Sequence, residues 1–122
     1  DVTIVTWGAM TQETMRAAAE LDAQGVGAEV IDLATLSPID SETILSSVAK
    51  TGRLLIVHEA ARNVGVGAEI AAIVAEHGLF DLQAPIHRVT GYDTVMPLSR
   101  LEHDYIPSVR RIVDAVHTVL AD

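Results

Sequence analysis

A histidine, a carboxylate and an arginine follow a short apolar run in this chain. His58, Glu59 and Arg62 come directly after residues 54–57, Leu-Leu-Ile-Val. They almost form H-E-x-x-H, a zinc motif that needs a second histidine on the same helical face. Arg62 replaces that histidine, and a guanidinium cannot ligate Zn²⁺. His58 and Glu59 are also candidates for an acid–base pair. Neighbouring side chains that leave a strand point in opposite directions, so we favour a hydrogen-bonded loop at a subunit contact, where Arg62 clamps a carboxylate.

Two glycines a few residues later invite comparison with a phosphate-binding loop. Gly65 and Gly67 stand as G-x-G, but the dinucleotide fingerprint needs Gly or Ala at the position of Ile70. It also needs its first glycine directly after the strand, whereas seven residues, 58–64, lie between the strand and Gly65 here. A closely packed loop that opens a helix is therefore favoured. Anion binding at a helix N-terminus keeps a regulatory small-anion or nucleotide-binding module open as an alternative.

A third polar cluster, Glu102-His103-Asp104, cannot supply a metal site easily, because consecutive side chains do not converge on one ion. It predicts a polar loop before the last helix. The P-loop and nucleophile-elbow motifs are absent from the sequence, which removes those two classes of enzyme. The chain has no cysteine, so neither a disulfide framework nor a thiolate metal site is expected.

The elements that position these residues alternate between strands and helices. Strands are predicted at residues 2–6, 28–33, 54–57 and 86–89, and helices at 11–24, about 41–51, 67–77 and 107–120. Asp40 is expected to cap the second helix and Gly52 to end it. Met15, Ala18 and Leu21 should face the core from the first helix, and the almost wholly apolar helix 67–77 should be deeply packed. This alternation predicts βαβ units and a parallel sheet covered on both faces, with functional groups at the carboxyl ends of the strands.

Charge and length bound the function further. The 122 residues carry 8 Lys+Arg against 17 Asp+Glu, a formal net charge of −9. This disfavours binding to nucleic acid or to anionic membranes. The length predicts one domain over residues 1–122, and no apolar run suggests a membrane span. The chain begins at Asp1, one residue before a strand, which is equally consistent with a cut inside a longer polypeptide and with loss of an initiator Met. The lack of cysteine fits a cytoplasmic protein.

Five segments in order carry a specific resemblance: residues 2–10, 29–40, 50–54, 58–70 and 84–94. Together they resemble the C-terminal domain of the beta subunit of thiamine-diphosphate-dependent 2-oxoacid dehydrogenases, a member of the transketolase C-terminal domain family. The resemblance implies a three-layer α/β/α sandwich. Its sheet would be mostly parallel and five-stranded, with one antiparallel strand near residues 96–101.

The resemblance also implies an enzyme whose chemistry lies elsewhere. The whole enzyme decarboxylates a 2-oxoacid oxidatively and acylates the lipoyl group of an acyltransferase. Thiamine diphosphate and Mg²⁺ would bind between the alpha subunit and the beta subunit's N-terminal domain, so this domain alone is expected to bind neither and to be inactive. No catalytic residue, cofactor ligand or metal ligand is assigned to it.

Assembly and docking are the roles that the resemblance implies for this domain. It would pack within an α2β2 heterotetramer with an alpha subunit and a second beta subunit. The implied subunit-interface residues form one loop and the start of a helix: His58, Glu59, Arg62, Gly65, Gly67 and Glu69. The implied docking residues for the subunit-binding domain of the acyltransferase are Leu82, Gln83 and Asp122. In a eukaryote such an enzyme would reside in the mitochondrial matrix.

Substrate class follows only by association. The segments His58-Glu59-Ala60 and 90–94 are more similar to branched-chain 2-oxoacid members than to bacterial pyruvate members. Gln83 stands where pyruvate-type members often carry an acid, and Ala61 and Val95 stand where prolines are frequent. The partner contacts are therefore expected to differ from those members at these positions. The C-terminal domain of transketolase or of deoxyxylulose-phosphate synthase is the remaining alternative within the family.

Overall fold

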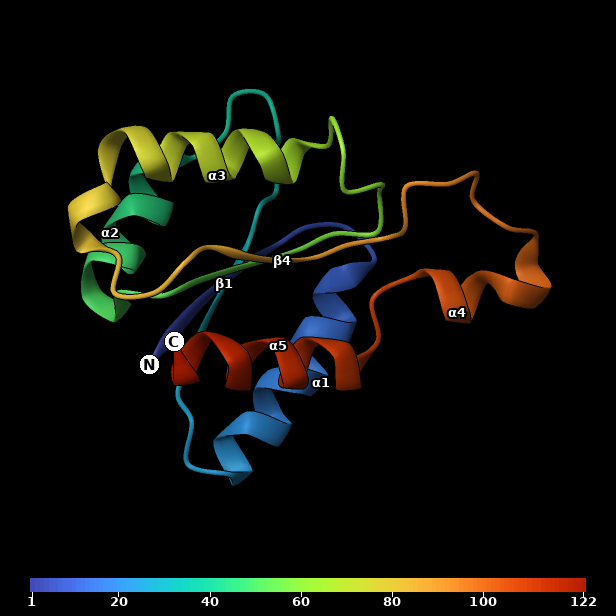
Figure 1. Ribbon diagram of the computed structural model, residues 1–122, viewed down its shortest axis with the longest axis horizontal. Helices are drawn as coiled ribbons and strands as arrows, with labels where there is room; N and C mark the ends of the chain where they lie inside the picture. Colours follow the sequence, from blue (N-terminus) through green and yellow to red (C-terminus); the bar gives the residue numbers. More distant parts are fainter.

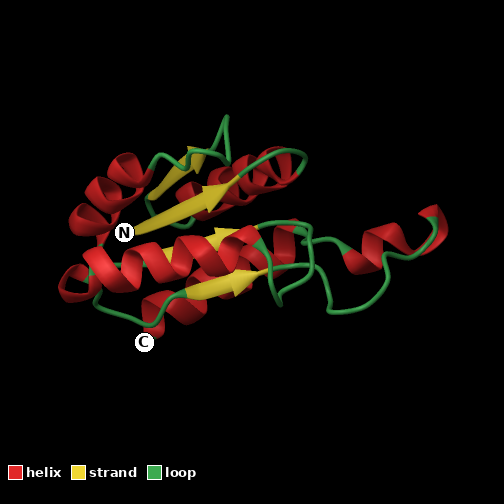
Figure 2. Cartoon of the chain, turned by 90° about the horizontal axis from the view of Figure 1, so that it is seen from above, coloured by secondary structure: helices red, strands yellow, loops and turns green.

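The computed structural model describes all 122 residues, which form a parallel sheet of four strands. The strands run in the order β2-β1-β3-β4 and all point the same way (Figure 2). Their bounds are β1 (Val2–Thr6), β2 (Ala28–Asp32), β3 (Leu54–Val57) and β4 (His87–Val89). All four residues of β3 are buried, as expected of a strand covered on both faces. The four predicted strands are therefore confirmed, with β2 and β4 each one residue shorter than predicted.

Two pairs of helices cover the two faces of this sheet (Figure 1). One face packs against α1 (Met10–Ala23) and α5 (Val109–Ala121), and the other against α2 (Ser41–Thr51) and α3 (Val66–His77). Each face has its own aliphatic cluster, the first centred on residues such as Leu55 and Ile112 and the second on Ile56 and Ile70. The three-layer α/β/α sandwich is confirmed. None of the helices is long and apolar enough to cross a membrane.

The expected fifth, antiparallel strand is absent, and that prediction is wrong. Residues 96–101 leave the sheet and end in a 3₁₀ turn, η2 (Ser99–Leu101), which leads into the short helix α4 (Glu102–Tyr105). Pro97 lacks the backbone N–H that a strand interior requires. The segment instead projects from the body beside α5 (Figure 1).

The buried face of α1 is rotated from the prediction. Met15 is 54% exposed, whereas Met10, Thr14, Ala17 and Leu21 are buried. The helix starts at Met10, one residue before the predicted start, and the Thr11 hydroxyl donates a hydrogen bond to Asp32 at 2.9 Å.

Several helix ends follow their sequence signals. Asp40 caps α2 by accepting a hydrogen bond from the Thr43 backbone N–H at 3.1 Å. Gly52 ends α2 with φ of 72°, a left-handed conformation that favours glycine. At α5 the cap is Ser108, which accepts from the Arg111 N–H at 3.2 Å, and the helix begins two residues after Pro107.

The prediction of deep packing holds for only one side of α3. The helix runs from Val66 to His77, and its buried residues are Gly67, Ile70 and Val74. Ala72 and Ala75 on its outer side are exposed. A run of small apolar residues therefore does not require burial all round the helix.

A further 3₁₀ turn, η1 (Leu79–Asp81), joins α3 to the segment that enters β4.

Candidate functional site

The crevice between β1 and β3 is the place where an open parallel sheet of this kind would hold a ligand. The chain passes from β1 to β2 on one side and then crosses to β3 on the other, so the strand order reverses between β1 and β3. Ligands of open α/β proteins bind outside the carboxyl ends of strands at such a point. Trp7 and His58 are the residues that leave β1 and β3 there.

Trp7 and His58 fill this crevice with stacked rings. Their ring centroids lie 5.3 Å apart and their planes are inclined by 13°. The His58 side chain is only 1% exposed. Its ring also closes the space beside the glycines of α3, because a Cβ on Gly67 would lie 2.6 Å from His58 Nε2 and one on Gly65 3.2 Å from Cε1. The predicted tight packing of this glycine loop is therefore confirmed.

His58 is a buried imidazole without a hydrogen-bond partner on either ring nitrogen. Burial lowers its pKa, the positive charge of Arg88 lowers it further, and the backbone of Ala60 opposes this shift only in part. Glu59 is exposed and makes no bond with His58, as the opposite directions of neighbouring residues predict. The His58 imidazole is therefore shielded from solvent in this structure.

The loop after β3 is tied by hydrogen bonds between side chains and backbone to β4 and to the segment that follows it. Arg62 donates to the Arg88 carbonyl and Arg88 to the Arg62 carbonyl, both at 3.2 Å. The Asn63 N–H donates to Asp93 at 2.8 Å. Arg62 thus bonds a carbonyl of its own chain and not a carboxylate of it, which differs from the expected clamp. At the tip, Val64 is fully exposed with φ of 58°, a left-handed conformation that is strained for a β-branched residue.

The predicted interface residues consequently fall into two groups. His58 and Gly67 are buried, so they shape this loop from within. Glu59, Arg62 and Glu69 are exposed, and Gly65 is half-buried.

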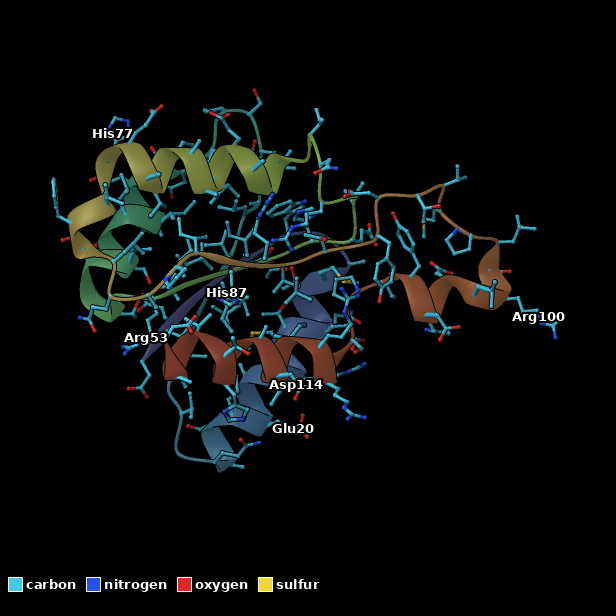
Figure 3. The ribbon with its side chains drawn as sticks, viewed as in Figure 1. Glu20, Arg53, His77, His87, Arg100 and Asp114 are labelled. Carbon is cyan, nitrogen blue, oxygen red and sulfur yellow. The ribbon has the colours of Figure 1, made fainter.

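The predicted docking residues Gln83 and Asp122 contact Arg53 and His87, which lie at the opposite, amino edge of the sheet (Figure 3). Gln83 accepts a hydrogen bond from Arg53, which precedes β3, at 3.3 Å. Asp122 lies 3.1 Å from His87 at the start of β4. Leu82 is half-buried against the α2–α3 side of the core. Interface and docking predictions therefore concern two separate ends of the domain.

Two observations bear on whether this domain could hold thiamine diphosphate and Mg²⁺ by itself. No three His, Asp or Glu side chains gather where they could hold a metal ion. The crevice that would receive a cofactor is filled by the side chains of Trp7 and His58.

The sequence profile of the family described as "Transketolase, C-terminal domain" matches residues 1–112. The chain belongs to this family. Curated relatives include the beta subunit of the pyruvate dehydrogenase E1 component of Staphylococcus epidermidis, 44% identical over 120 residues, and that of Staphylococcus aureus, 45% identical over 120 residues. Each match covers 98% of this chain and 37% of the relative, so the chain spans little more than a third of the relatives' length.

Solved structures agree on the fold of this transketolase C-terminal domain. A structure described as a split gene transketolase, inactive beta4 tetramer, superposes with a TM-score of 0.86 at 33% identity and covers 99% of this chain and 38% of that one. The 2-oxoglutarate:ferredoxin oxidoreductase of Magnetococcus marinus superposes with a TM-score of 0.68. At 14% identity, over 98% of this chain and 18% of that one, it supports the fold alone.

The pairing of Trp7 with His58 was missed from sequence. A signal for it existed, since each residue directly follows a predicted strand and the reversal of strand order brings those strands together. No comparable signal in the sequence predicts that the apolar segment 91–106 projects from the body, because its residues follow neither a helical nor a strand period.

Proposed function

We propose that this chain is the assembly and docking domain of the beta subunit of a thiamine-diphosphate-dependent 2-oxoacid dehydrogenase. The observation that carries an assembly role is the filled crevice between β1 and β3, where stacked Trp7 and His58 take the place of a ligand. Identity of 44–45% with pyruvate dehydrogenase beta subunits over nearly the whole chain supports the kind of enzyme. The domain would bind no cofactor by itself and would contribute surfaces instead of reacting groups.

The loop after β3 is proposed as the contact with the other subunits of an α2β2 heterotetramer. Its tip presents Val64 fully exposed and strained, and Glu59 and Arg62 are exposed beside it. Strain of this kind persists where surrounding structure holds it and is concentrated at functional contacts. The buried His58 ring and the glycines next to it would keep the loop in the shape that the partner meets.

The amino edge is proposed as the docking surface for the subunit-binding domain of the lipoyl acyltransferase. Leu82, Gln83 and Asp122 lie there, and η1 adds a fully exposed Phe80. With a net charge of −9 the chain suits a basic docking module. Higher salt should weaken that contact, because screening shortens the reach of such charges.

A branched-chain 2-oxoacid is proposed as the substrate of the whole enzyme in preference to pyruvate. The proposal rests on the similarity of His58-Glu59-Ala60 and of residues 90–94 to branched-chain members. The Staphylococcus relatives carry the name of the pyruvate enzyme. The ratio of kcat/KM for 3-methyl-2-oxobutanoate to that for pyruvate decides between the two substrates.

The proposal is tested on the native beta subunit, starting from the open reading frame that encodes this chain. A thiamine-diphosphate-binding domain encoded upstream of Asp1 is expected, and a start codon directly before Asp1 would contradict the proposal. The complete beta subunit, co-expressed with the alpha subunit, should form an α2β2 complex that decarboxylates 2-oxoacids. Arg62→Glu should shift that complex towards smaller species in light scattering. Arg110→Glu, on the outer side of α5, is the matched control.

A transketolase is the second candidate, favoured by the 33% identity and TM-score of 0.86 to the split gene transketolase. The same purified complex separates the two. Transfer of a ketol group from a ketose phosphate, with no turnover of 2-oxoacids, would establish the transketolase and exclude the dehydrogenase. No observation favours the small-anion module, since the His58 ring closes the space beside Gly65 and Gly67.

A further inference from the structure

His58 is the only buried histidine among the five of this chain. Trp7, the only tryptophan, lies on one face of its ring, and Gly65 and Gly67 lie against the edge of the ring. The residue is 1% exposed with this chain alone, so its surroundings are complete without any other polypeptide. The behaviour of the ring is therefore a property of the domain itself.

Neither nitrogen of the enclosed ring has a hydrogen-bond partner among the side chains and backbone around it. A neutral imidazole carries one N–H donor, whereas the imidazolium carries two and a positive charge. A buried charged donor without an acceptor is much costlier than a neutral one. Stacking on Trp7 attracts a cation to the ring face but offers no acceptor to the N–H groups at the ring edge. The closed crevice therefore tolerates the neutral ring and disfavours the protonated one.

The charged groups around the ring do not offset this penalty. Burial lowers the pKa of His58, the positive charge of Arg88 on β4 lowers it further, and the backbone of Ala60 opposes the shift only in part. Neither β1 nor Trp7 contributes a charged group on the other side. The other titratable side chains on the loop, on the first turn of α3, on β4 and on the segment after β4 are exposed or paired elsewhere: Glu59, Arg62, Glu69, His87 and Asp93. No carboxylate is thus placed to stabilise a protonated ring inside the crevice.

The loop over the ring, residues 59–65, is held closed by few contacts. Val64 at its tip has a φ of 58°, so the closed loop already contains a strained residue. The hydrogen bonds that tie the loop to Arg88 and Asp93 are all exposed to solvent. The backbone N–H of His58 itself donates to the Val89 carbonyl at 3.1 Å, which anchors the start of the loop to β4. Local opening should therefore begin after His58 and leave the sheet intact.

We propose that protonation of His58 opens this crevice reversibly: the imidazolium leaves the space between Trp7 and the glycines of α3 for solvent, and loop 59–65 moves with it. The ring cannot find an acceptor by a small adjustment, because a Cβ at Gly67 would already lie 2.6 Å from Nε2. The open form binds the proton more readily than the closed form, so a falling pH shifts the equilibrium towards the open form. The crevice is thus a pH-sensitive element of the fold. The proposal does not rest on the proposed function, since every part of the device belongs to this chain.

The test uses the 122-residue chain, in which all tryptophan fluorescence comes from Trp7. Quenching of that fluorescence by acrylamide and the far-ultraviolet circular dichroism are measured together from about pH 7.5 to about pH 4.5, a range that brackets the ordinary histidine pKa. Quenching should rise as the pH falls below about 6.5 and reverse on return, while the dichroism stays unchanged. Between the pKa values of the closed and the open ring, the ratio of open to closed chains should rise about tenfold for each pH unit lost. In NMR spectra the amide signals of Gly65 and Gly67 should shift with the same midpoint, and that of Gly52, at the other edge of the sheet, should not.

Variants assign the transition to one residue. His58→Phe and His58→Gln do not titrate in this range, so both should abolish the rise in quenching, and either is sufficient if the other does not fold. His77→Gln, at an exposed histidine at the end of α3, is the matched control and should keep the transition. A rise that persists in the His58 variants would assign the transition to another group and overturn the proposal. So would constant quenching over the whole range, or dichroism that is lost in step with the fluorescence change, because the ring would then stay enclosed or the whole domain would unfold.

Discussion

Replacing Gly67 by alanine should destabilise the domain, although alanine is the better helix former. A Cβ at this position would lie 2.6 Å from His58 Nε2, 2.7 Å from His58 Cδ2 and 3.3 Å from Ile56 Cγ2. The imidazole has little room to withdraw, because Trp7 stacks on its face at 5.3 Å and the ring is buried. The steric conflict therefore falls on a rigid part of the core and not on the end of a flexible side chain.

The two opposing contributions can be compared. Overpacking a filled site costs about 1–3 kcal/mol. Exchange of glycine for alanine within a helix contributes up to about 1 kcal/mol in the other direction. The expected net loss in the free energy of unfolding is therefore about 1–2 kcal/mol, measured as a lower urea midpoint with an unchanged slope.

A double-mutant cycle isolates the contact between Gly67 and the histidine. In a His58→Ala background the space beside position 67 is open, so Gly67→Ala should become neutral or stabilising. The coupling free energy should then exceed about 1 kcal/mol, well above the few tenths expected of independent sites. If Gly67→Ala costs the same in both backgrounds, the imidazole does not fill this space and the account of the closed crevice is wrong.

Three further predictions concern the same edge of the sheet and its neighbours. Burial and the Arg88 charge lower the pKa of His58, so the unfolded chain binds a proton more readily than the folded one. The free energy of unfolding should therefore be highest above about pH 6.5 and fall as the pH drops below that value. Urea unfolding of the wild type and of His58→Phe from pH 7 to pH 5 should show this loss in the wild type alone. Ser108→Ala removes the cap of α5 and should cost about 1 kcal/mol in urea unfolding, whereas Ser46→Ala on the exposed face of α2 should cost almost nothing. Val64→Gly relieves a left-handed β-branched residue and should raise the stability of the isolated chain by up to about 1 kcal/mol in thermal unfolding, and an unchanged or lower stability would show that Val64 is unstrained.

Strong local signals made much of the fold predictable from sequence. Residues 54–57 are continuously apolar, and a strand buried on both faces needs that pattern. Asp40 and Gly52 mark the two ends of α2 with a cap and a left-handed residue, and each does so by a local mechanism that depends little on the rest of the chain.

Other features depend on tertiary packing, and the spacing of apolar residues along the sequence does not predict them. In α1 the run of alanines makes several faces nearly equally apolar, so the sequence could not decide between Met10 and Met15 for the core. In α3 the small residues Ala72 and Ala75 fit either burial or exposure, and they lie on the exposed side of a helix whose other side carries the buried Ile70 and Val74. The prediction of a fifth strand rested on the resemblance alone. Pro97 lacks a backbone N–H, and residues 91–106 project away from the sheet, so no strand forms there.

The candidate site was located by position more than by chemistry. The strand ends predicted where to look, and His58 was placed correctly at one of them. What the sequence could not show was the direction of the side chain, because the choice between facing solvent and facing Trp7 depends on the glycines that leave room for the ring. The same applies to Arg62, whose guanidinium reaches a backbone carbonyl that only the folded loop presents.

The four aromatic residues lie at the two ends of the domain, where they shape its surfaces. None of them is a buried member of the two aliphatic clusters that form the core. Trp7 and His58 together fill the crevice. The rings of Tyr92 and Tyr105 pack edge to face at the base of the projecting segment 91–106. Phe80 is exposed on η1. Aromatic rings have few rotatable bonds and large contact areas, so they hold a surface in place at low entropic cost. A domain that catalysed a reaction at the switch point would need that crevice open to substrate. Here Trp7, the largest side chain of the protein, stacks on the buried His58 imidazole and keeps the crevice closed.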